Sequence, residues 1–115
     1  MKYRSSKQAI AKHPTPEVKE AVGERDGWRC IRCGRHGDPV AHYIPRTKGG
    51  LGIEENILTL CNDCHKEYDS SRGMKRVGMM EEFADYLKSK YPNWDEKKLI
   101  YHKYIFKEDI WEHRE

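Results

Sequence analysis

Polar and hydrophobic residues change their spacing along the chain, and each spacing predicts a different element. Residues 1–14 are polar and basic without a regular period, so we expect a flexible basic arm. A helix is expected from Pro16 to about Arg25, because Thr15 can accept a hydrogen bond from its first turn and proline is favoured at its first position. Asp26-Gly27 is a typical helix end.

Two short apolar runs, at 39–44 and 57–60, predict two strands. They are separated by a polar, glycine-rich segment over 46–56, which predicts a long ordered loop. A second helix is expected to begin near Asn62, directly after the second strand, and to continue through Asp69. The middle of the chain is therefore expected to follow the order strand, loop, strand, helix.

A stripe of methionine and aromatic residues marks the C-terminal third. These large side chains recur at helical spacing and are followed by Pro92, which predicts a helix packed on the core through Met79, Met80, Phe83, Tyr86, Leu87 and Tyr91. The basic, glycine-flanked stretch 72–78 before it is expected to be a linker. After it, Asn93 or Asp95 is expected to cap a further helix that reaches Lys103.

The composition is too polar for a large hydrophobic core. Of the 115 residues, 36% are charged and 37% hydrophobic, so a further stabilising element such as a metal or disulfides is expected. No apolar run approaches the ~20 residues of a membrane helix. The first residues also lack the apolar stretch of a secretory signal. A membrane protein and a secreted protein are therefore not expected.

Positive charge is concentrated in the first half of the chain. The net charge is +3, but residues 1–50 hold 11 Lys and Arg against 5 Asp and Glu, a balance of +6. Residues 51–115 hold 11 against 14, a balance of −3. A basic half favours an anionic partner, most commonly a nucleic acid, with an ordinary solvated surface as the alternative.

Four cysteines form two identically spaced pairs, Cys30-x-x-Cys33 and Cys61-x-x-Cys64. Where thiols stay reduced, four thiolates at this spacing predict a closed, tetrahedral structural zinc site. Zinc binding would supply folding free energy that the thin core lacks. Two redox pairs or an iron–sulfur centre are the alternatives at this point.

The segment between the cysteine pairs contains the run His42-x-x-Pro45-Arg46-x-x-Gly49-Gly50, followed by Asn56. His65 comes directly after the second pair, nine residues beyond Asn56. Together with both cysteine pairs, this arrangement over residues 17–70 resembles the HNH endonuclease family, in particular its small phage and bacterial members with a four-cysteine zinc. The resemblance implies an α+β, ββα-metal (His-Me finger) fold with an N-terminal helix and a C-terminal helical extension. We expect the nuclease core at 15–76 and the extension, packed on it, at 77–115.

The resemblance also implies metal-dependent hydrolysis of phosphodiester bonds in DNA, by cutting or nicking. Imidazole can accept a proton from water near neutral pH, so His42 is expected to be the general base. Asn56 takes the family position that holds the strand carrying the base. His65 takes the position of a ligand to a catalytic divalent cation, Mg²⁺, Mn²⁺ or Ni²⁺.

Ala41 departs from the family pattern, in which an Asp or His before the base binds the metal. Asp69 is expected to substitute, because it lies four residues after His65 and shares its helix face. Colicin DNases place a second helix-borne ligand at this spacing. The alternatives are a weak site that only nicks, or a non-catalytic zinc-containing module that binds nucleic acid. A zinc domain for protein interaction through the stripe at 79–91 is a third alternative.

Basic residues near the expected site supply candidate contacts to DNA. Arg46 and Lys48 are expected to contact phosphates, and further sequence-independent contacts are expected from Arg29, Arg32 and Arg35. His13 has no partner at a meaningful spacing and is expected at the surface. The family resemblance further suggests a cytoplasmic location in a bacterial host, a phage origin and a phage packaging protein as partner.

Overall fold

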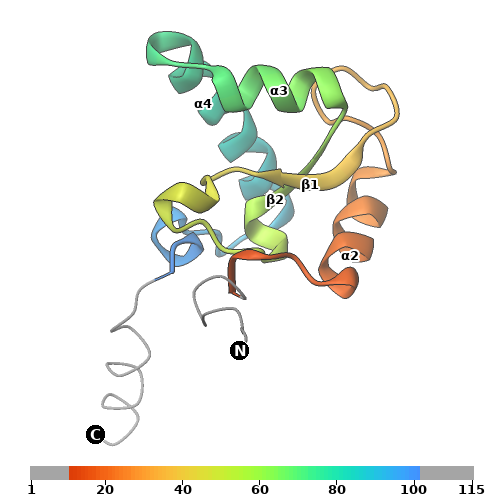
Figure 1. Ribbon diagram of the computed structural model, residues 1–115. Helices are drawn as coiled ribbons and strands as arrows, with labels where there is room; N and C mark the ends of the chain where they lie inside the picture. The colour runs from red at the N-terminus through yellow and green to blue at the C-terminus, as the bar shows by residue number, and fades with distance from the viewer. Residues whose placement is uncertain (1–10, 102–115) are drawn as a thin grey trace, which may run out of the picture.

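A computed structural model describes residues 11–101 as a small antiparallel hairpin surrounded by helices (Figure 1). In chain order the helices and strands are α2 (Pro16–Asp26), β1 (Asp38–His42), β2 (Ile57–Leu60), α3 (Asn62–Ser70) and α4 (Gly73–Lys90). Short 3-10 helices lie at Arg46–Lys48, Glu54–Asn56 and Glu96–Leu99. The predicted α+β class is confirmed. No helix in the described part of the chain is long and apolar enough to cross a membrane.

Helix α2 has the predicted ends. The Val18 amide donates to Thr15 Oγ1 at 3.2 Å, and Gly27 ends the helix with φ 68°. Arg25, in the last turn, donates to the carbonyl oxygens of Glu54 and Ile57 at 2.9 and 2.8 Å. Its neighbour Asp26 has a fully buried side chain and pairs with the same guanidinium at 2.7 Å. This buried ion pair fastens α2 to the start of β2.

The first strand of the hairpin, β1, ends at His42, the candidate general base. Strands β1 and β2 pair with Asp38 opposite Leu60 and His42 opposite Ile57, and a bulge interrupts the register between Pro39 and Ala41. The predicted first strand was too long, because the amide of Ile44 donates to the Asn56 side chain instead of to β2. The second strand has its predicted bounds.

Helix α3 packs against the sheet through one buried aromatic residue. Tyr68 has no exposed surface, and its hydroxyl donates to the carbonyl oxygen of Tyr43 at 2.7 Å, just past the end of β1. Phe83 of α4 meets the Tyr68 ring edge-on, with centroids 4.9 Å apart. The core therefore joins the sheet, α3 and α4 around Tyr68.

The expected linker at 72–78 is wrong, because α4 already begins at Gly73. Its first turns are held by a tertiary contact: Arg76 donates to the carbonyl oxygen of Tyr68 at 2.8 Å and lies 4.4 Å above the Tyr68 ring. The predicted apolar stripe packs as expected. It buries Met79, Phe83 and Leu87, while the other stripe residues are partly buried.

The expected last helix is shorter than predicted. Asp95 caps it by accepting from the amide of Lys97 at 3.0 Å, but it is a 3-10 helix that ends at Leu99. Residues 99–101 then run antiparallel to the loop at 49–51. The Leu51 amide donates to Leu99 at 2.8 Å and the Tyr101 amide donates to Gly49 at 2.7 Å. The expected end at Lys103 and residues 1–10 of the expected arm lie outside the described residues.

Candidate active site and metal centre

Four cysteine sulfurs converge at the start of α3, from Cys30, Cys33, Cys61 and Cys64. All four sulfur atoms lie within 4.8 Å of one another, and those of Cys33 and Cys61 are 3.6 Å apart. A tetrahedral zinc with bonds of about 2.3 Å holds its sulfurs roughly 3.8 Å apart, so this donor set fits a metal ion. The predicted four-cysteine metal-binding cluster is therefore present.

Local groups favour the thiolate form that binds metals. The amides of Cys33 and Cys64 each donate to the sulfur three residues earlier, Cys30 and Cys61, at 3.4 Å. The Arg35 guanidinium, 3.5 Å from the Cys33 sulfur, lowers the pKa of that thiol to about 6. Burial acts in the opposite direction at Cys64 and raises the pKa of its thiol to about 12.

The basic residues beside this cluster are engaged within the protein. Arg32 pairs with Glu67 of α3 at 2.9 Å, and Arg35 pairs with Asp63 at 3.3 Å besides contacting the cysteine sulfurs. Arg29 donates to a main-chain carbonyl at 3.1 Å. These three arginines surround the cysteine cluster, and none of them lines the cleft described next.

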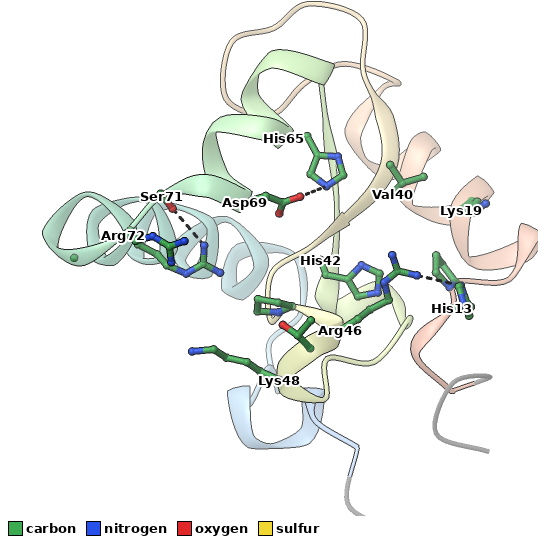
Figure 2. A pocket seen from close by; sticks show the side chains of 15 residues that line it. His13, Lys19, Val40, His42, Arg46, Lys48, His65, Asp69, Ser71 and Arg72 are labelled. Atoms are coloured by element: carbon green, nitrogen blue, oxygen red, sulfur yellow. Dashed lines mark hydrogen bonds and ion pairs between the residues drawn. The ribbon is translucent and has the colours of Figure 1, made fainter. Parts of the chain in front are cut away.

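A cleft of about 840 Å³ lies between the end of β1, the exposed face of α3 and the 3-10 helix at Arg46–Lys48 (Figure 2). It brings together most of the residues predicted for the catalytic site: His42, Arg46, Lys48, His65 and Asp69. Asp69 is the one carboxylate that lines it within the described residues. The cleft is therefore a strongly basic surface with three polar groups suited to proton transfer or metal binding at its centre.

His42, at the last position of β1, is half-buried. Its Nε2 lies 2.8 Å from the main-chain carbonyl oxygen of Lys12. Burial lowers the pKa of the ring below the ordinary histidine value, and the positive charge of Arg46 acts in the same direction. Backbone hydrogen bonds to Lys12 and Val40 oppose this shift without cancelling it. The ring is therefore neutral at pH 7.

His65 and Asp69 lie one helical turn apart on α3 and point at each other (Figure 2). His65 Nε2 is 3.3 Å from Asp69 Oδ2, and their side chains are 29% and 62% exposed. An imidazole nitrogen and a carboxylate oxygen this close can bind the same divalent cation. The rest of a coordination shell would be open to solvent and substrate.

Ala41 does not face this cleft. Its side chain is fully buried in the core, while Val40 and His42 on either side of it line the cleft. This alternation is the ordinary two-residue period of a strand, and the exposed and buried positions alternate along the whole of β1. Within the cleft, β1 thus offers the His42 ring as its one donor side chain, and α3 offers His65 and Asp69.

Asn56 lies behind the cleft and holds its backbone. The buried side chain accepts from the amide of Ile44 at 2.8 Å and donates to the carbonyl oxygens of Ile44 and Leu51, at 3.2 and 2.8 Å. These three bonds tie both ends of the loop that carries Arg46 to the chain just after His42. The side chain is therefore placed to fix the end of β1.

Several residues that line the cleft were not predicted from the sequence, among them His13, Lys19 and Arg72. His13 is exposed, as expected, and it also lines the cleft, with Nδ1 3.4 Å from Arg46 Nη1. Lys19 of α2 and Arg72 at the start of α4 line opposite walls. The basic character of 72–78 was a signal for Arg72. Lys19 and His13 reach the cleft through tertiary packing, which no local pattern reveals.

The hairpin, the helix that follows it and the four-cysteine cluster define a ββα-metal domain. Residues 30–71 match the HNH endonuclease family. The chain is also 31% identical over 72 residues to the type IV methyl-directed restriction enzyme EcoKMcrA of Escherichia coli (strain K12). That similarity covers 54% of this chain and 26% of the relative, so the chain matches about a quarter of that enzyme's length.

Proposed function

We propose that this protein is a metal-dependent endonuclease that hydrolyses phosphodiester bonds in DNA. The observation that carries the proposal is the cleft, which unites a neutral histidine, a histidine–carboxylate pair and several cations. The HNH family match and the similarity to a restriction enzyme support it.

His42 is the proposed general base. It accepts a proton from the attacking water as the new bond to phosphorus forms and the bond to the leaving oxygen breaks. Its lowered pKa supports this role, because the ring is already neutral and able to accept a proton at pH 7. Asn56 is the proposed positioning residue, because its hydrogen bonds hold the chain directly after the base.

His65 and Asp69 are the proposed ligands of a catalytic divalent cation, Mg²⁺, Mn²⁺ or Ni²⁺. Such a cation supplies charge stabilisation at the scissile phosphate. The separation of 3.3 Å between the two donor atoms supports a shared ion. The cysteine cluster is the proposed site of a separate, structural zinc, because four sulfur donors close a tetrahedral shell.

Four cations of the cleft are the proposed contacts to DNA phosphates: Lys19, Arg46, Lys48 and Arg72. Within residues 11–101, none of them forms an ion pair with a carboxylate, unlike Arg32 and Arg35 beside the cysteine cluster. Unpaired cations on both walls suit a phosphate backbone, and such contacts are independent of sequence. A cytoplasmic location in bacteria, a phage origin and a phage packaging partner stay predictions from the family resemblance.

A plasmid-nicking assay tests the proposal. Purified protein is incubated with supercoiled DNA and Mg²⁺, Mn²⁺ or Ni²⁺, and the nicked and linear products are quantified. His42→Ala is expected to slow nicking by about 10²- to 10⁴-fold, the usual contribution of a general base. His36→Ala is the matched control, because its ring is 80% exposed and lies outside the cleft.

Equal trace nicking by the wild type and His42→Ala would show that the activity is a contaminant and would refute the proposal. Salt-dependent DNA binding that survives His42→Ala, without cleavage under any of the three metals, would instead identify a non-catalytic nucleic-acid-binding module.

A further inference from the structure

Residues 11–14, which we call the strap, contact two functional groups of the cleft. The Lys12 carbonyl oxygen lies 2.8 Å from His42 Nε2. The next residue, His13, lies with Nδ1 3.4 Å from Arg46 Nη1 (Figure 2). The strap therefore contacts both the proposed base and a proposed phosphate-binding group.

The contact with His42 fixes the form of its ring that suits a general base. A carbonyl oxygen can only accept a hydrogen bond, so the one proton of the neutral ring lies on Nε2 when Lys12 is bonded to it. Nδ1 then keeps its lone pair and can accept a proton from water. Burial lowers the pKa of the ring, and the Lys12 carbonyl opposes this more strongly than the Val40 backbone does. The Lys12 carbonyl is therefore the main backbone group that orients the base.

The contact with Arg46 holds a long, exposed side chain. Its guanidinium can only donate, so Nδ1 of the neutral His13 ring accepts the hydrogen bond. An exposed arginine otherwise samples many rotamers, and holding it in one orientation lowers the entropy cost of binding a phosphate. A guanidinium has five N–H donors, so this contact leaves others that can bind a phosphate.

The strap has a defined position because it packs against Gly52, in the loop that follows Arg46. The amide of Gly52 donates to the Ala11 carbonyl oxygen at 3.0 Å. A Cβ atom on Gly52 would lie 2.4 Å from the His13 carbonyl carbon and the Pro14 nitrogen. Main chain therefore packs on main chain, with no room for a side chain between the strap and the loop.

We propose that the strap is a positioning element of the catalytic centre, in which the Lys12 carbonyl oxygen orients His42 and the His13 ring orients Arg46. The family match begins at residue 30, so these positioning groups come from a part of the chain outside the match. This inference rests on the proposed function, because it adds positioning groups to the same cleft.

Proton and nitrogen-15 NMR of the histidine rings tests the contact with His42. In the wild type we expect an unprotonated Nδ1 and a protonated Nε2 whose hydrogen exchanges slowly with water. Gly52→Ala displaces the strap and is expected to lose this slowly exchanging proton. Gly78→Ala is the matched control, since a Cβ there meets no atom within 4 Å.

The kinetics of plasmid nicking give a second readout for Gly52→Ala. Its kcat is expected to fall about 10- to 100-fold, because a displacement of roughly 1 Å at a catalytic group can cost up to about 100-fold. Gly78→Ala is expected to keep the wild-type kcat. Circular dichroism checks that both variants are folded.

A pair of substitutions at His13 tests the contact with Arg46. His13→Ala removes the acceptor and is expected to raise the KM for DNA about 2- to 10-fold with little change in kcat, the effect of one net hydrogen bond. His13→Asn supplies an amide oxygen as acceptor and is expected to restore the wild-type KM. Both variants leave Gly52 unchanged, so the test stays decisive if Gly52→Ala is unfolded.

A wild-type His42 whose Nε2 is unprotonated or exchanges freely would overturn the proposal. So would a folded Gly52→Ala that nicks as fast as the wild type or faster, or a wild-type KM in His13→Ala.

Absence of nicking in every variant would refute the proposed nuclease instead. The strap is then judged by the NMR signal of His42 and by duplex affinity in Mg²⁺-free buffer. This affinity is expected to fall about 2- to 10-fold in His13→Ala and to recover in His13→Asn. A wild-type affinity in His13→Ala would overturn the role of the strap.

Discussion

Two candidate metal sites meet on helix α3, and they differ in nearly every respect. The cysteine site has four sulfur donors from two turns, three of them on buried residues, and all lie within 4.8 Å. The site in the cleft has one nitrogen and one oxygen from a single helix face, 3.3 Å apart and partly exposed. Cys64 and His65 are neighbours in the chain, yet each lies in a different candidate site.

The comparison shows that one site is suited to stabilising the fold and the other to chemistry on a substrate. Successive residues of a helix point about 100° apart, so α3 can present Cys64 to a buried cluster and His65 to an open cleft. A closed shell leaves no position for substrate and contributes to folding, whereas an open shell leaves room for water and phosphate. One short helix can thus join a folding element to a reactive one.

Removing the metal from the cysteine site should have the largest effect. Cys64→Ser, or a strong chelator on the wild type, is expected to abolish cooperative thermal unfolding followed by circular dichroism. The physical reason is that structural zinc can contribute on the order of 10 kcal/mol to folding in small domains. His65→Ala should keep the wild-type melting curve. A chelated wild type that melts like the metal-loaded protein would contradict the closed, structural role of the cluster.

Removing the carboxylate from the open site should have an intermediate effect on metal use and none on folding. Asp69→Ala is expected to raise the cation concentration for half-maximal nicking by about tenfold or more, because one of two protein ligands is lost. Asp63→Ala, on the same helix but paired with Arg35 outside the cleft, is the control. Titration with Mn²⁺ measures the change, and an unaltered requirement for the ion would exclude Asp69 as a ligand.

The smallest expected effect is the change of the nicking rate with pH, which tests the role of His42 in the cleft. Burial and Arg46 lower the pKa of His42, so the ring loses its proton at a lower pH than an ordinary histidine. The nicking rate is therefore expected to rise with pH, to reach its plateau near pH 7 and to change by less than about 1.5-fold from pH 7 to 8. Rates in constant ionic strength and saturating metal measure this. An inflection above pH 7 would argue against His42 as the base.

The features that depend on local residue spacing could be predicted from the sequence. The two strands, the cap of α2, the start of α3 and the convergence of two cysteine pairs all follow from neighbours within a few residues. The placement of His42, His65 and Asp69 in one cleft followed from the family resemblance. These features could be predicted because each depends on a short, strongly constrained pattern.

Features that depend on tertiary contacts could not be predicted. The first turns of α4 are held by Arg76 on Tyr68, so glycines at both ends of the segment gave the wrong prediction of a linker. Lys19 and His13 reach the cleft only because α2 packs beside the hairpin.

The pairing of residues 99–101 with the loop at 49–51 shows that similarity and folding have different boundaries. The family match ends at residue 71, yet the loop that carries Arg46 and Lys48 is braced by main-chain bonds from almost thirty residues further on. Phe83, Leu87 and Leu99, all beyond the match, are buried in the same core. A fragment trimmed to 30–71 would keep the signature residues but lose the contacts that position them. The recognisable motif is therefore smaller than the cooperative folding unit.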